Sequence, residues 1–111
     1  MMDEQVRRRA RNEVLFRSLN EEIKRVESEN GADATAPVDF VCECSSAACM
    51  KVVTLPLTEY ETVREASSTF IVAPDHEEPE IEEVVARHTR YSVVKKRGEA
   101  AEVAADTNPR D

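Results

Sequence analysis

The residues best able to do chemistry in this chain are three cysteines close together in the sequence. Cys42, Cys44 and Cys49 are the chain's only cysteines. Residues two apart on a strand point to the same side, so Cys42 and Cys44 can face one ion. A short loop at residues 45–48 then allows Cys49 to return to it. Thiolates suit zinc, which takes four ligands in a tetrahedral array, so the spacing predicts a zinc site with one ligand still to find.

His76 is the preferred candidate for the fourth ligand. It lies in a proline-bracketed turn directly after a predicted strand, and such a turn holds a side chain in a fixed direction. Asp75 or Glu77 could accept a hydrogen bond from the free imidazole nitrogen. His88, in a second predicted turn, is the competing candidate, and a carboxylate or a water stays open. Four protein ligands would make the zinc structural, because catalytic zinc keeps an open position.

The same cysteines permit two other interpretations. Cysteine is often buried, and a strand with Phe40, Cys42 and Cys44 on one face could pack them in the core. Alternatively, Cys49 could form a disulfide with Cys42 or Cys44 and release the metal, which would make the site a thiol-based redox or zinc sensor. The concentration of all three cysteines in one segment favours zinc.

The charge and composition exclude several classes of function. The net charge is −8, from 23 acidic and 15 basic residues, so the chain is repelled by phosphate backbones and nucleic-acid binding is disfavoured. Only Gly31 and Gly98 are glycines, so no phosphate-binding glycine loop exists. No serine–histidine or cysteine–histidine catalytic pair can be assigned, and we expect no enzymatic activity. A local basic cluster precedes the acidic remainder and is interpreted as a solvated helix start: Arg7, Arg8, Arg9 and Arg11.

No apolar stretch approaches the length of a membrane span, and no apolar signal segment begins the chain. We therefore expect a cytoplasmic protein without membrane contact. An odd number of cysteines in a reducing compartment argues against a disulfide framework.

The first segment predicts a long helix at residues 3–29, ended by Asn30 and Gly31, which tolerate the left-handed conformation of a helix end. Its apolar residues recur with helical period. The stripe could pack on a partner helix or a second copy, or be covered by the chain's own sheet. Its members are Val14, Leu15, Leu19, Ile23 and Val26.

The remaining segments predict short strands and one short helix. A hairpin of residues 38–44 and 51–55 comes first. A Thr58-x-x-Glu61 capping box predicts a helix from about 59 to 66. Strands follow at 69–73 and 91–96, whereas residues 81–85 fit a helical turn or a strand equally. The segment after Gly98 lacks an apolar face and is expected to be a flexible tail.

Together these elements predict an α+β fold, with a long N-terminal helix, a small antiparallel sheet and one short helix. The expected parts are the helix at 1–30, a small zinc-binding domain at 38–97 and the tail at 98–111. Zinc would pin the first hairpin to the turn at residues 74–77.

Several stretches resemble a family of small uncharacterised proteins of actinobacterial type, marked by a C-x-C-x4-C motif and a downstream turn around His76. The resemblance covers residues 11 to about 104 and implies no catalytic residue. The stretches are RNEVLFRSLNEEI, FVCEC with Cys49, LPLTEYETVR, FIVAPDHE and YSVVKKRGEAAEVA.

The expected function is that of a small zinc-binding adaptor or regulatory protein, with the redox or zinc sensor as the alternative. A protein partner would bind the helix stripe or the acidic surface, and self-association is possible through the same stripe.

Overall fold

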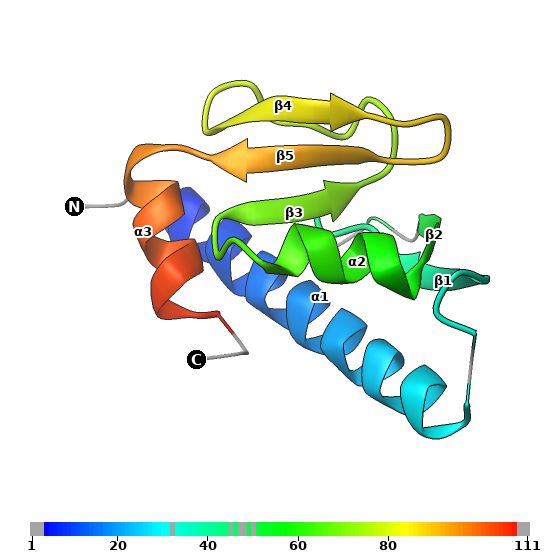
Figure 1. The fold of residues 1–111 in the computed structure, drawn as a ribbon. Coiled ribbons are helices and arrows are strands. Elements are labelled where there is room, and N and C mark those ends of the chain that lie inside the picture. Colours follow the sequence, from blue (N-terminus) through cyan, green and yellow to red (C-terminus); the bar gives the residue numbers. More distant parts are fainter. Residues whose placement is uncertain (1–3, 32, 45, 47–48, 50, 109–111) are drawn as a thin grey trace.

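One long helix and two small antiparallel sheets make up most of the fold (Figure 1). The computed structural model describes residues 4–31, 33–44, 46, 49 and 51–108. The predicted α+β class is confirmed, with two sheets in place of one. In chain order the elements are α1 (Glu4–Glu29), β1 (Pro37–Val41), β2 (Val52–Pro56), α2 (Leu57–Arg64), β3 (Thr69–Val72), β4 (Glu82–Arg87), β5 (Ser92–Lys96) and α3 (Gly98–Asp106).

Helix α1 spans 26 residues and ends at Glu29, where the sequence predicts its end. Gly31 has φ +77, a conformation that glycine adopts without strain. Its N–H donates to the Ser28 carbonyl at 3.2 Å, and the Asn30 N–H donates to the Val26 carbonyl at 3.0 Å. These bonds satisfy carbonyls that the end of a helix leaves open. The first predicted helical residue, at position 3, lies outside the described part.

The side of α1 that packs against the rest of the molecule is polar. Glu13, Arg17 and Asn20 are buried, whereas Leu15 and Leu19 are exposed. The apolar stripe of α1 is therefore only partly covered by the rest of the chain. Ile23 packs against the core from the edge of the stripe.

The first sheet is the predicted hairpin, but its first strand ends at Val41, so Cys42 and Cys44 lie just beyond the strand that was predicted to include them. Strands β1 and β2 pair antiparallel, with Val38 opposite Leu55 and Phe40 opposite Val53. These four side chains point into the core, where the Phe40 ring stacks on Tyr60 with centroids 4.4 Å apart.

Helix α2 follows β2 without a loop and starts earlier than the capping box predicts. Its N-cap is Pro56, and no side chain caps it, so the predicted cap at Thr58 is wrong. Thr58 lies inside the first turn, and its N–H donates to the Ala34 carbonyl at 3.1 Å. A backbone carbonyl from the preceding loop thus satisfies a first-turn donor.

The second sheet has the strand order β3-β5-β4, and both pairs are antiparallel. Residues from Glu82 onward form β4, which decides the ambiguous segment in favour of a strand. A register shift between Val84 and Ala86 marks a bulge, and the extra residue, Val85, is exposed.

The flexible tail expected after Gly98 is wrong for Gly98–Asp106, which forms α3 beside the N-terminal part of α1 (Figure 1). Ala104 is buried there, and its carbonyl accepts a hydrogen bond from Arg17 Nη1 at 3.1 Å. A helix that packs through alanine shows little apolar pattern, which is why its sequence resembles a tail. Residues 109–111 lie outside the described part.

Candidate metal centre

The segment that carries Cys42 and Cys44 lies between the two sheets. The Cys42 N–H donates to the Lys51 carbonyl at 3.1 Å, next to β2. The following N–H, of Glu43, donates to the Ile71 carbonyl of β3 at 2.8 Å. Both cysteines are buried, and their sulfur atoms belong to one cluster, although the segment that carries them lies beyond the end of β1. The chain therefore bridges the two sheets at this point.

Cys49 returns to the pair after the predicted loop. Its N–H donates to the Ser46 carbonyl at 3.1 Å. Ser46 is the one residue of the predicted 45–48 loop that the structure describes; residues 45, 47 and 48 lie outside the described part.

His76 is aimed by a tight turn after β3. The His76 N–H donates to the Ala73 carbonyl at 3.0 Å, and Asp75 within the turn has φ +68. Aspartate is among the few residues other than glycine that visit this left-handed region readily. The turn reverses the chain and directs the imidazole back toward the cysteines.

The ligand atoms of Cys42, Cys44, Cys49 and His76 all lie within 4.8 Å of one another. The His76 Nδ1 atom is 3.7 Å from Cys42 Sγ and 3.5 Å from Cys49 Sγ. A tetrahedral ion with metal–sulfur bonds of about 2.3 Å and a metal–nitrogen bond of about 2.0 Å would separate nitrogen from each sulfur by about 3.5 Å. The two distances to the imidazole thus match the edges of such a tetrahedron.

His88, the competing histidine, is not part of this cluster. It is exposed, and its ring stacks on Tyr91 with centroids 4.4 Å apart. Among the described residues, His76 is therefore the histidine that joins the three cysteines.

The four ligand residues differ in their exposure to solvent. Cys42 and Cys44 are buried, whereas Cys49 and His76 are half-buried, so the cluster meets solvent on the Cys49–His76 side. The pKa of the Cys44 thiol is lowered chiefly by a hydrogen bond from the Cys42 thiol, with smaller contributions from His76 and the Ser46 N–H. The pKa of Cys42 is raised by that same hydrogen bond and by burial. Cys44 is thus readily available as a thiolate, the form that binds metals.

Glu77, the acidic residue that follows His76, has a contact of its own. Glu77 accepts a hydrogen bond from Arg87 at 3.1 Å. The pKa of Glu77 is lowered, mainly by its own backbone N–H and less by Arg87 and His76. The sequence-based suggestion that Asp75 or Glu77 orients the imidazole stays a prediction.

Sequence reasoning missed the side chain between the two buried cysteines. Glu43 is fully buried and points away from the sulfur atoms. Its carboxylate accepts hydrogen bonds from Arg64 Nη2 at 2.6 Å, Asn20 Nδ2 at 2.8 Å and the Ile71 N–H at 3.0 Å. Helices α1 and α2 and strand β3 therefore all hold the segment that presents the cysteines. The alternation of side chains along residues 42–44 predicts that Glu43 points away from the two cysteines. It does not predict which groups bind the Glu43 carboxylate.

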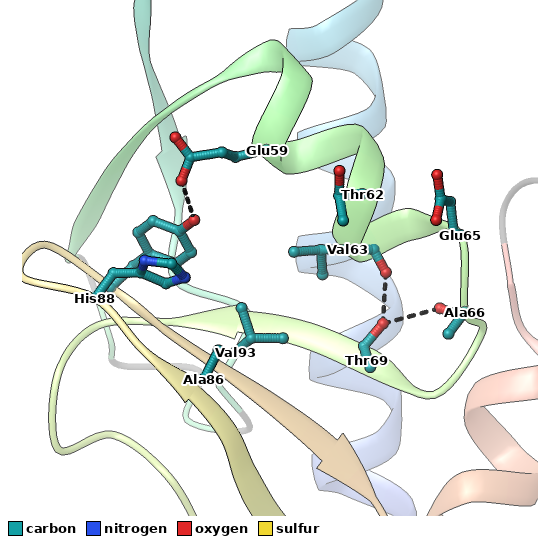
Figure 2. Close-up of a pocket in the computed structure, with 10 residues that line it drawn as sticks. Glu59, Thr62, Val63, Glu65, Ala66, Thr69, Ala86, His88 and Val93 are labelled. Carbon is teal, nitrogen blue, oxygen red and sulfur yellow. Dashed lines mark hydrogen bonds between the residues drawn. The ribbon is translucent and has the colours of Figure 1, made fainter.

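A separate hollow of about 450 Å³ lies between α2 and the second sheet (Figure 2). Its lining is mostly apolar, with Val63, Ala86 and Val93 among its members. The carboxylates of Glu59 and Glu65 also line it, and Glu59 accepts a hydrogen bond from the Tyr91 hydroxyl. The hollow is thus apolar with acidic groups at its rim.

Comparison of the chain with models of protein families, with curated proteins and with solved structures finds no match. Among the described residues, no helix combines the length and apolar character needed to cross a bilayer. Function is therefore inferred from the cysteine–histidine cluster and the surfaces around it.

Proposed function

We propose that this protein is a small, non-enzymatic zinc-binding module that acts as an adaptor or regulator through contacts with other proteins. The observation that carries the zinc proposal is the convergence of three sulfur atoms and one imidazole nitrogen within 4.8 Å. Soft thiolates with one imidazole suit zinc better than calcium or magnesium, which prefer oxygen ligands.

The ion would serve a structural role. Four protein ligands complete a tetrahedral shell and leave no position for a substrate or a reactive water. The ligands come from the segment after β1 and the turn after β3, and Cys42 and His76 are 34 residues apart in the chain. Closing a loop of this length removes freedom from the unfolded chain, so binding of the ion contributes to folding.

Charge supports a function in protein contacts. The net charge of −8 favours basic partners and disfavours nucleic acids. The hollow beside α2 offers an apolar surface with Glu59 and Glu65 at its rim, suited to a basic protein with an apolar side chain to insert.

The zinc proposal is tested by metal analysis of protein purified without chelators or metal-binding tags. We expect about one zinc per chain in the wild type, because four protein ligands saturate one tetrahedral ion. Cys44→Ser and His76→Ala should lose the metal. His88→Ala is the matched control, since it removes a histidine outside the cluster, and it should keep the metal. A folded wild type without metal would refute the proposal.

A second candidate function, a thiol-based redox or zinc sensor, is favoured by the solvent access of the cluster on the Cys49–His76 side. Peroxide would take two electrons from Cys49 and one neighbouring thiolate, which form a disulfide, while the peroxide takes up two protons and becomes two waters. The zinc ion, having lost two ligands, would leave. Mild peroxide distinguishes the functions: an adaptor keeps its zinc, whereas a sensor releases it and gains a reducible Cys49 disulfide.

A further inference from the structure

The outward face of α1 carries an apolar stripe that the described part of the molecule leaves exposed. The exposed fractions are 63% for Leu15, 45% for Leu19 and 40% for Val26. At about 100° per residue, these three positions lie within about 40° of one another around the helix axis. The buried polar residues Glu13 and Arg17 lie on the opposite side. Leu15, Leu19 and Val26, the exposed part of the stripe, therefore point away from the described remainder of the molecule.

Charges of opposite sign flank this stripe along the helix. Arg8 and Arg11 lie on the same face toward the N-terminal end, and both are exposed. Glu22 and Glu29 lie on it toward the other end and are also exposed. Arg25 contacts both of these carboxylates, so that end still carries a net negative charge.

The helix itself does not account for this order of charges. The carboxyl end of a helix disfavours acidic side chains because the helix dipole is negative there. The last turn of α1 nevertheless holds Glu29 and no basic residue. A partner that presents positive charge at this end would offset that cost.

We propose that two copies of this chain associate through the outward faces of their α1 helices, in antiparallel orientation. A twofold axis near Ser18 and Leu19 places Arg8 of one copy opposite Glu29 of the other, and the same pair recurs on the far side of the axis. The leucines then meet at the centre. A parallel pair would place like charges opposite each other along the whole contact.

The size of the contact sets the expected strength. The stretch from Arg8 to Glu29 is about 31 Å long at about 1.5 Å per residue. A contact of this length and one helix wide is at the small end for stable interfaces, so the dimer should dissociate in the micromolar range or above.

This inference rests on the proposed function in one respect: it names a partner for the protein contacts. It does not require the zinc site, which lies on other elements. The two can therefore fail separately.

Sedimentation of the full-length, zinc-loaded chain over a range of concentrations tests the inference. We expect a concentration-dependent dimer in the wild type. L15E/L19E should weaken it at least tenfold, because four carboxylates would be forced into the apolar centre. Val52→Glu is the matched control, since Val52 is 59% exposed but lies on β2, and it should dimerise like the wild type.

A charge-reversal pair tests the orientation. Arg8→Glu should weaken the dimer about three- to tenfold, since each dimer loses two surface ion pairs. R8E/E29R should restore it, because the pairs re-form with reversed sign. These positions are exposed, so the fold should persist, which circular dichroism checks.

Each outcome decides the inference. A wild type that stays monomeric at all concentrations while holding one zinc overturns it and leaves the zinc module standing; the stripe would then serve a different protein. A dimer insensitive to L15E/L19E, or one that R8E/E29R fails to restore, also overturns it. A dimer without metal that responds to both sets of variants supports the inference and contradicts the zinc proposal.

Discussion

At the scale of single residues, the cysteines depend on a carboxylate that has no part in metal binding. The Glu43 carboxylate accepts hydrogen bonds from three partners on three elements. Arg64, one of these partners, is itself buried. Removal of Glu43 would leave the Arg64 guanidinium buried without its counter-charge, which is a costly arrangement in a protein interior.

Glu43→Ala is therefore expected to lower the free energy of unfolding by about 3–5 kcal/mol. It should also weaken zinc binding, because the segment between the two sheets loses its anchor. Urea unfolding and metal analysis measure the two effects. Glu83→Ala, at an exposed position of β4, is the control and should change stability by less than about 0.5 kcal/mol. A Glu43→Ala protein as stable as the control would contradict this account.

A second buried cluster contains two carboxylates for one ammonium group. Lys96 Nζ lies 2.6 Å from the Glu13 carboxylate and also contacts Glu82. All three side chains are buried. Burial is the main reason that the pKa of Glu13 is raised to about 7, although Lys96 opposes the shift. The surplus negative charge in the cluster favours a proton on Glu13.

This raised pKa predicts a pH dependence of stability. The folded pKa of Glu13 exceeds its ordinary value of 4.5, so the folded state holds a proton that the unfolded chain releases. The stabilising contribution is complete below about pH 4.5 and is lost as the pH rises through about 7. The free energy of unfolding of the wild type should therefore fall as the pH rises from 5 to 8. In Glu13→Gln this fall should be smaller, by up to about 3 kcal/mol.

Urea unfolding at both pH values measures this difference. The two proteins differ only at position 13, so the comparison isolates Glu13. Glu83→Gln, at an exposed position, should keep the wild-type dependence. An unchanged dependence in Glu13→Gln would show that Glu13 stays ionised throughout.

At the scale of elements, α1 packs through hydrogen bonds where its sequence pattern predicts apolar contact. Asn20 acts like a residue of a neighbouring strand: its Nδ2 donates to the Val41 carbonyl at 2.9 Å, and its Oδ1 accepts from the Val41 N–H at 2.8 Å. Arg17 lies over the Phe70 ring, 4.3 Å from its centroid. Hydrophobic periodicity cannot predict that these polar residues are buried, because it identifies a buried face only by its apolar residues.

Local sequence patterns were sufficient to predict the long helix, the hairpin and the grouping of the three cysteines with His76. The end at Gly31, the alternation around Cys42 and the turn that carries His76 are each encoded within a few residues. What could not be predicted depends on distant partners. Arg17 and the Ala104 carbonyl are 87 residues apart, and a single sequence contains no sign that they meet. The same holds for α3, whose alanines become a packing face only beside α1.

The packing of α3 is testable at Ala104. Leucine at this buried position should overpack the contact with α1 and lower the free energy of unfolding by about 1–3 kcal/mol. Glu102→Leu places the same side chain at an exposed position of the helix and should have little effect on stability. Urea unfolding compares the two, and equal stability would mean that residues 98–106 do not pack on α1 in solution.

At the scale of the whole molecule, the cluster lies where two sheets that share one hydrophobic core meet. The core extends well beyond the cluster, through Phe40, Tyr60, Phe70 and Val94. Removal of the metal should therefore loosen the junction before it unfolds the chain.

Hydrogen exchange with and without a strong chelator checks this expectation. The amides of Cys42, Cys44, Cys49 and His76 should exchange faster after chelation, whereas those of α1 and β5 should stay protected. The reason is that the first set is held by the cluster and the second by the core. Equal acceleration throughout the chain would instead indicate that zinc supports the fold as a whole.

The cluster also changes how the chain responds when it is pulled from its ends. With an ion bound, the backbone from Cys42 to His76, which are 34 residues apart, forms a closed ring that tension cannot straighten. At about 3.4 Å per extended residue, the ring withholds about 115 Å of chain. A machine that threads unfolded proteins through a narrow pore would meet this ring as an obstacle. It would have to break the metal–thiolate bonds before the remainder of the chain could pass.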